Sequence, residues 1–320
     1  MKRIKFFPAG ALFGICLLSA ISCSQGAIAR SGPDIGAGIV LVGSTPGNDA
    51  VKTMLSIPAD AKIDFIRWEL TLSPPEKTAK TFSLDLNYGE GKPNTRNFIE
   101  DHKFSLSGKY EIARGADTSG SNIKADIYKF TPDKTADKPA VSFSLVKIND
   151  NIFHLLSAES TFMVGNGGWS YTLNRKQPAG AGASLPVLAK VPPLADAKTA
   201  QVIFVGRTPC AEIAAQFAIE IPDDCFKLKW KLTLDRDPKT FAPATYTLQR
   251  THHRPTAIEG KWTMKEKAGA VIYQLDPDKP DRSLSFLLAD ENVMFFLDKN
   301  EQLFTGNGEF SYTMDKKPAQ

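Results

Sequence analysis

The feature that most constrains this chain is an internal repeat, because the same blocks of sequence occur twice in the same order. The clearest pair is GNGGWSYTLNR at 165–175 and GNGEFSYTMDK at 306–316. A repeat of this kind decides how many folding units a chain contains, so it comes before any other pattern. The other paired blocks are VGSTPG (42–47) with VGRTPC (205–210), IRWELTL (66–72) with LKWKLTL (228–234), TFSL (81–84) with TYTL (245–248), SGKY (107–110) with EGKW (259–262), and IYKFTPDK (127–134) with IYQLDPDK (272–279).

The repeat divides the chain of 320 residues into two similar domains, which we place at 34–176 and 197–320. Each copy has the size of an ordinary domain and is long enough to bury its own core. Between them, 177–196 reads QPAGAGASLPVLAKVPPLAD. Its Pro, Gly and Ala content and its lack of periodicity are typical of a linker.

Within each copy the pattern is that of β-strands. Segments such as WELTL, TFSLDLNY, KWKLTL and EFSYTM alternate apolar with polar or small residues, and turn sequences such as Gly-Asn-Gly separate them. Short, regularly spaced strands of this kind predict an all-β sandwich or a small closed barrel. The segments 47–57 and 209–221 differ, because their apolar residues recur at helical spacing. We expect one short helix in each copy, covering the mouth or flank of its barrel.

Large aromatic residues occupy equivalent positions in the two copies, which favours packing over ligand binding. Met264 and Met294 could act as soft metal ligands, but both lie in apolar runs and are expected in the core. The equivalent aromatic pairs are Trp68 with Trp230, Tyr110 with Trp262, and Trp169 with Phe310.

The N-terminus has the layout of a secretory signal peptide, which we place at 1–22. Lys2, Arg3 and Lys5 precede an apolar run that is too short and too broken to span a membrane comfortably. Cys23 follows small residues at its end and resembles the cysteine of a bacterial lipobox, which is acylated and becomes the mature N-terminus. We therefore expect lipidation at Cys23, a tether over 23–33, and an outer-membrane lipoprotein facing the periplasm or the surface.

An alternative is ordinary signal-peptide cleavage after Ala29, which follows an A-x-A sequence and would give a soluble periplasmic or secreted protein. Removal of the three basic residues of the signal lowers the formal net charge from +4 to +1. The remaining charges of both signs are interspersed, so the sequence predicts no nucleic-acid partner.

Cys210 and Cys225 are the only cysteines that lie clear of the N-terminus. In an oxidising compartment two such cysteines form a disulfide by default, and this one would tie the start of the expected helix to the next strand. A redox-active pair and a metal site are the alternatives, in that order. A metal site would need further ligands, and the candidates are poor: His252 and His253 are adjacent, so on a strand they would point to opposite faces.

No sequence motif of a catalytic site is present: there is no G-x-S-x-G, no H-E-x-x-H, no P-loop and no G-x-G-x-x-G after a strand. The Gly-Asn-Gly segments at 165–167 and 306–308 are interpreted as hairpin turns. We therefore expect no enzymatic activity.

The second copy resembles the N-terminal domain of NlpE-type proteins, a family of outer-membrane lipoproteins associated with copper homeostasis and envelope stress. The resemblance lies in PCAEI at 209–213, GKW at 260–262 and LDKN at 297–300, which follow one another in the family's order. It implies two small antiparallel, lipocalin-like β-barrels in tandem, attached to the membrane by a lipid. The family's C-x-x-C is incomplete, because Ile213 stands at the second cysteine position, and the first copy has Gly47 in place of Cys210.

Three hypotheses for the function follow. The first is a non-catalytic, lipid-anchored module that senses stress or contacts other envelope proteins. The second is a lipocalin-like carrier of a small apolar ligand or lipid. The third is a copper-binding protein; the sequence predicts no cofactor with a complete ligand set, so copper is left open.

Overall fold

The structure is a computed structural model, and it describes residues 38–114, 123–134, 141–180, 185–189, 199–251 and 255–318. All of them belong to one compact unit. The predicted signal peptide, Cys23, the tether, the cleavage position Ala29, and both His252 and His253 lie outside the described residues.

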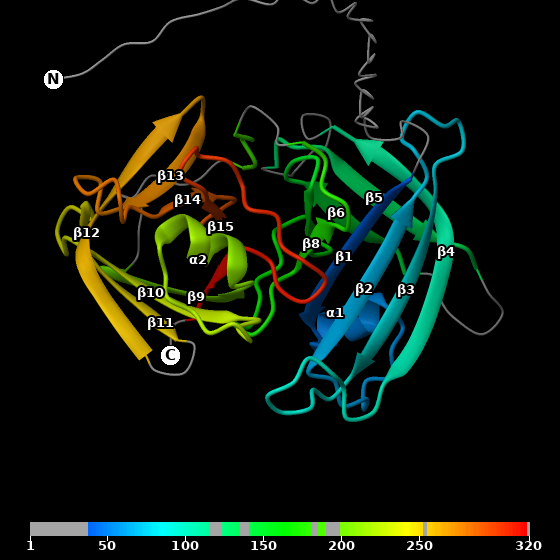
Figure 1. Ribbon diagram of the computed structural model, residues 1–320. Coiled ribbons are helices and arrows are strands. Elements are labelled where there is room, and N and C mark those ends of the chain that lie inside the picture. Colours follow the sequence, from blue (N-terminus) through cyan, green and yellow to red (C-terminus); the bar gives the residue numbers. More distant parts are fainter. Residues whose placement is uncertain are drawn as a thin grey trace, which may run out of the picture. The chain divides into compact units, whose positions relative to one another are not determined.

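The first copy forms a closed antiparallel barrel of eight strands, in which each strand pairs with the next and β8 closes onto β1 (Figure 1). One short helix, α1 (Asp49–Met54), connects β1 to β2. The strands are β1 (Ile39–Pro46), β2 (Phe65–Leu72), β3 (Thr81–Gly89), β4 (His102–Ala113), β5 (Ile127–Pro132), β6 (Phe143–Lys147), β7 (Ile152–Leu156) and β8 (Thr172–Arg175).

The second copy repeats this barrel element by element, with β16 closing onto β9 and with α2 (Ala211–Phe217) between its first two strands. The expected fold class, two tandem antiparallel barrels with one short helix each, is confirmed. The strands are β9 (Gln201–Thr208), β10 (Leu228–Arg236), β11 (Pro243–Thr251), β12 (Pro255–Lys267), β13 (Ala270–Leu275), β14 (Ser285–Leu288), β15 (Val293–Leu297) and β16 (Thr313–Lys316).

Alternation along the strands fills each barrel with side chains. On β10, Leu228, Trp230, Leu232 and Leu234 are buried while the residues between them are at least partly exposed. In the first barrel the aromatic rings pack on one another, with Phe130 stacked on Phe143 at 4.7 Å between ring centroids. An eight-stranded barrel is just wide enough to be filled in this way.

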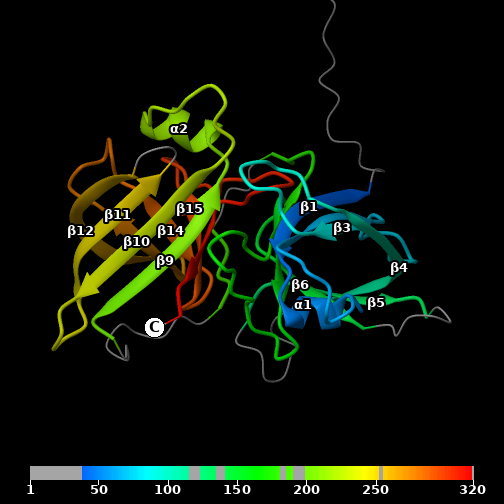
Figure 2. The ribbon, with the colours of Figure 1, turned by 90° about the horizontal axis from the view of Figure 1, so that it is seen from below.

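The two helices bury one face each against the end of their own barrel. Asn48 caps α1 by accepting a hydrogen bond from the Val51 backbone nitrogen at 3.1 Å, and the Val51 side chain is buried in the first core. Ile213 and Ala214 of α2 are buried in the second core, and Figure 2 shows α2 beyond the ends of β9 and β10. Neither described helix is long and apolar enough to cross a membrane.

The repeated tryptophans Trp68 and Trp230 are core residues, as the sequence predicts. The indole nitrogen of Trp68 donates a hydrogen bond to Oγ1 of Thr45 at 2.8 Å, and Trp230 makes the same bond to Thr208 at 2.8 Å. Both threonines are fully buried, so each barrel offsets the burial of its indole N–H with a partner of its own.

Two core predictions were wrong. Met264 is 39% exposed, because the β12–β13 hairpin continues there past the packed interior that Trp262 faces. Trp169 is only half-buried: it lies on the loop before β8 and stacks on Phe65 at 4.7 Å between ring centroids.

Candidate functional site

The predicted disulfide between Cys210 and Cys225 is present, with 6.0 Å between the Cα atoms and a sequence separation of 15. Cys210 immediately precedes α2 and is 2% exposed, and Cys225 lies three residues before β10. The bond therefore ties the start of the helix to the start of the strand. In this state both sulfur atoms are bonded to each other, so neither is a free thiolate for a metal.

The described residues contain no cluster of three or more His, Cys, Asp or Glu side chains placed to hold a metal ion. The two methionines that could act as soft ligands lie apart in the fold: Met294 is fully buried in the second barrel, and Met264 is exposed on β12. Ile213, at the second position of the incomplete C-x-x-C, is fully buried in the core.

A second group of polar residues lies where the two barrels meet. At this seam, which we define by Ser170, Thr172 and Asn174 of the first barrel and Ser311, Thr313 and Asp315 of the second, equivalent residues of the repeat touch each other. The Oγ atoms of Ser170 and Ser311 are 2.6 Å apart, and the Oγ1 atoms of Thr172 and Thr313 are 2.9 Å apart. Such self-pairing is the mark of a twofold contact, here made within one chain.

The Gly-Asn-Gly segments complete the seam reciprocally. The backbone nitrogen of Gly165 donates to Oδ1 of Asp315 at 2.7 Å, and that of Gly306 donates to Oδ1 of Asn174 at 2.8 Å. A Cβ atom at Gly165 would lie 2.4 Å from the carbonyl oxygen of Trp169 and 2.5 Å from Oδ2 of Asp315, so a larger residue would clash both with its own loop and with the other barrel. The interpretation of these segments as simple hairpin turns missed that each one binds the other barrel.

An apolar core cluster shared by both barrels flanks the seam. All five residues of β7 and all five of β15 are buried, because one face of each strand points into its own barrel and the other face into this shared cluster. Part of the expected linker joins it, since Leu188 is 1% exposed there. Members of the cluster are Ile127, Val146, Ile152, Leu156 and Phe162 of the first barrel, and Ile272, Leu287, Val293, Phe295 and Leu297 of the second.

His154 is fully buried at the seam and uses both ring nitrogens. Nε2 lies 2.8 Å from the carbonyl oxygen of Met163, and Nδ1 lies 3.0 Å from Oγ1 of Thr172. Because a carbonyl can only accept, Nε2 carries the proton and Nδ1 accepts from Thr172. Burial lowers the pKa of His154 to about 4, so the ring is neutral at physiological pH.

Asp315 is the fully buried carboxyl group of the seam. Burial raises its pKa from 3.8 to about 7, the Gly165 N–H bond lowers it, and the nearby charge of Asp290 raises it. Its repeat equivalent Asn174 also donates, from Nδ2 to the carbonyl of Asn307 at 3.3 Å. Asp315 can match that donor only when it is protonated.

A cleft with a volume of about 1140 Å³ opens on the surface of the described residues. Its lining comes from both copies of the repeat and includes Asn151, Arg175, Glu212, Gln216, Asn300 and Gln302. Burial raises the pKa of Glu212, and the nearby hydroxyl of Tyr312 opposes that effect.

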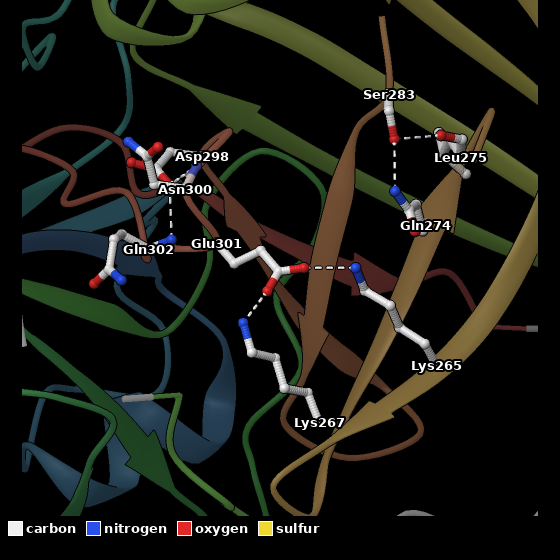
Figure 3. Close-up of polar contacts among 9 residues, drawn as sticks. All are labelled: Lys265, Lys267, Gln274, Leu275, Ser283, Asp298, Asn300, Glu301 and Gln302. Carbon is white, nitrogen blue, oxygen red and sulfur yellow. Dashed lines mark hydrogen bonds and ion pairs between the residues drawn. The ribbon is translucent and has the colours of Figure 1, made fainter. Parts of the chain in front are cut away.

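The loop that carries Asn300 and Gln302 is held in place by its own polar contacts (Figure 3). Oδ1 of Asp298 accepts hydrogen bonds from the backbone nitrogens of Asn300 and Gln302, at 2.8 and 2.7 Å. Glu301 of the same loop points toward β12, where it forms ion pairs with Lys265, at 2.5 Å, and with Lys267. The LDKN block therefore begins a fixed turn, and the side chains of Asn300 and Gln302 in this turn line the cleft.

Comparisons with family models, with curated proteins and with solved structures found no match for this chain.

Loss of the disulfide should destabilise the second barrel. For the double variant Cys210→Ala/Cys225→Ala we expect the free energy of unfolding to fall by about 3 kcal/mol, because closing a loop of 15 residues removes entropy from the unfolded chain. Urea unfolding, followed by tryptophan fluorescence, measures this change. The wild type under reducing conditions should lose the same amount, and a stability unchanged in both cases would contradict a structural role.

Replacement of Asp315 by asparagine should remove a pH dependence. The folded state binds the Asp315 proton more tightly than the unfolded state, so this group's contribution to stability is full below about pH 4 and is lost as the pH rises through about 7. We expect the free energy of unfolding of Asp315→Asn to equal that of the wild type near pH 4 and to exceed it at pH 8. The difference should grow by up to about 1.4 kcal/mol per pH unit.

Urea unfolding of both proteins between pH 4 and 8 measures this difference, in which the opposite pH dependence of His154 cancels. The matched control Asn174→Asp places a second carboxyl group in the equivalent position and should destabilise the protein at pH 8. A difference between Asp315→Asn and the wild type that stays constant over this range would show that Asp315 titrates normally.

Proposed function

We propose that this chain is a non-catalytic, lipid-anchored binding protein of the cell envelope, of the NlpE-like kind, which engages its partner on the outside of the two barrels. The observation that carries the proposal is the contrast between the barrel interiors, which side chains fill, and the open cleft of about 1140 Å³ to which both copies contribute.

The packing of the interiors favours an outside surface over an internal ligand. Phe130 and Phe153 in the first barrel, and Phe286 and Phe296 in the second, are fully buried members of their core clusters. A lipocalin-like carrier needs room within the barrel. An internal ligand would have to displace these rings, so the carrier hypothesis has less support.

The seam supports the proposal in a second way. Because buried hydrogen bonds and a shared apolar cluster join the two barrels, the residues that line the cleft are held at fixed positions. A preformed surface loses less conformational entropy when a partner binds. The role in envelope stress or copper homeostasis rests on the sequence resemblance alone.

Cross-linking tests where the partner binds. A photo-reactive amino acid in place of Asn300, which lines the cleft, should give a defined cross-linked protein in intact cells. The same residue in place of Lys109, which is exposed on β4 outside the cleft, should not. Equal products at both positions, or an apolar ligand that remains bound at one to one in native mass spectrometry, would overturn the proposal.

Membrane attachment is tested at Cys23. We expect Cys23→Ser to abolish labelling by radioactive palmitate, because the thiol that accepts the lipid is gone. The variant should also not be cleaved to give a mature N-terminus at position 23. The variant Cys210→Ala/Cys225→Ala should still be labelled. Wild-type protein that is unlabelled and begins at Arg30 would instead support cleavage after Ala29.

A further inference from the structure

Each barrel has a surface groove where its first two strands meet the Gly-Asn-Gly segment of the other barrel. The first-barrel groove has a volume of about 420 Å³ and includes Val42, Trp68 and Gly308. The second-barrel groove has a volume of about 360 Å³ and includes their repeat equivalents, Val205, Trp230 and Gly167. Five positions of the two linings are equivalent in the repeat, and beyond them the first-barrel groove extends onto β3 and β4 while the second extends along β9 and the loop at 166–168.

The two grooves differ in charge. The first-barrel groove is balanced, with Arg67 and Lys103 against Glu69 and Asp85. In the second-barrel groove the charged residues are all basic: they are Arg207, Lys229, Lys231 and Lys317. Positions that hold Ser44 and Glu69 in the first copy hold Arg207 and Lys231 in the second. The mature chain has a formal charge near neutrality, so this concentration of positive charge is local.

The basic residues are placed against one another. Arg207 on β9 lies directly opposite Lys229 on β10 in the strand register. Like charges in that arrangement destabilise a sheet. No described carboxylate forms an ion pair with Arg207, Lys229, Lys231 or Lys317. The fold thus gathers four cations without a counter-charge, which an anionic ligand would supply.

Arg207 is held in a geometry suited to an oxyanion. Its guanidinium carbon lies 5.4 Å from the centre of the Trp169 ring, which belongs to the first barrel. Stacking occupies the face of a guanidinium and leaves the N–H donors at its rim for a planar or tetrahedral oxyanion. Burial lowers the pKa of Arg207, which agrees with a cation partly removed from water.

The loop that carries Gly167 lines the groove and approaches β9 closely. Oδ1 of Asn166 fixes this loop by accepting from the nitrogens of Gly168 and Trp169, at 2.9 and 3.0 Å. Gly167 has a φ of +76°, and a Cβ atom there would lie 2.8 Å from Val205, so only glycine lets the loop approach β9. Among the residues that the structure describes, none accepts a hydrogen bond from the Gly167 nitrogen.

We propose that the second-barrel groove binds a phosphate-type oxyanion, either free or in the headgroup of an anionic lipid. Arg207 supplies oriented donors, Lys229 and Lys231 supply mobile charges, and the groove is large enough for a phosphate with a substituent. The first-barrel groove, with its two carboxylates, does not bind it. This site is separate from the cleft of the proposed function, so either can fail alone.

Calorimetric titration of the detergent-solubilised full chain tests the site. The probes are inorganic phosphate, dihexanoyl phosphatidylglycerol, and dihexanoyl phosphatidylcholine as the zwitterionic comparison. We expect phosphate or phosphatidylglycerol to bind at low ionic strength, more weakly at about 1 M salt, where the Debye length is about 3 Å. Binding of both anions supports a general phosphate site, and binding of phosphatidylglycerol alone supports a lipid headgroup.

Two matched variants locate the binding. Lys229→Gln/Lys231→Gln changes two exposed side chains and should weaken the affinity by about tenfold or more. Lys103→Gln/Lys109→Gln removes the same charge from exposed positions on β4, of which Lys103 lines the first-barrel groove, and should change it less than about twofold. An equal loss in both variants, no loss in the first, or no binding of either anion to the wild type would overturn the proposal.

Discussion

The pairing of equivalent residues across the seam is the contact on which the rest of the structure depends. Thr172 meets Thr313, Ser170 meets Ser311, and each Gly-Asn-Gly segment donates a backbone N–H to the other barrel. These buried polar groups satisfy one another, and buried groups that lose such partners are costly. Because the bonds fix register as well as distance, the barrels meet in one arrangement. The cleft and the two grooves then follow as the open edges of that arrangement.

Much of the fold could be predicted from the sequence. The repeat, the alternation of apolar residues and the turn residues predicted two all-β domains, and the two cysteines that lie clear of the N-terminus predicted the disulfide. The seam was not predicted from the sequence, although the sequence contains an indication of it. The sequences of β7 and β15, IFHLL and VMFFL, are almost continuously apolar, which is typical of strands covered on both faces. Alternation describes one sheet and its own core, so it contains no information about a second barrel on the outer face.

The candidate site was harder to predict for the same reason. His154 and Asp315 received no role from the sequence, because their chemistry arises from burial that only the other barrel supplies. Comparison of the copies position by position would have singled these two residues out. The first copy has His154 where the second has Phe295, and it has Asn174 where the second has Asp315. The charge of the second groove is visible in the same comparison, but its meaning depends on the loop that closes over it. Trp169 likewise looks like a core residue until Arg207 is found beside it.

A twofold contact has a consequence for how such a protein can change. When two identical chains meet about an axis, every substitution appears on both sides of the interface at once. A substitution that is tolerated only when the opposite side keeps the original residue therefore cannot persist. Covalent connection of the copies removes that restriction. In this chain an amide faces one Gly-Asn-Gly segment and an acid faces the other, an imidazole lies opposite a phenyl ring, and only one half is cross-linked. The halves keep the geometry of a symmetric pair while each has become chemically distinct, which is how one groove can be neutral and its twin basic.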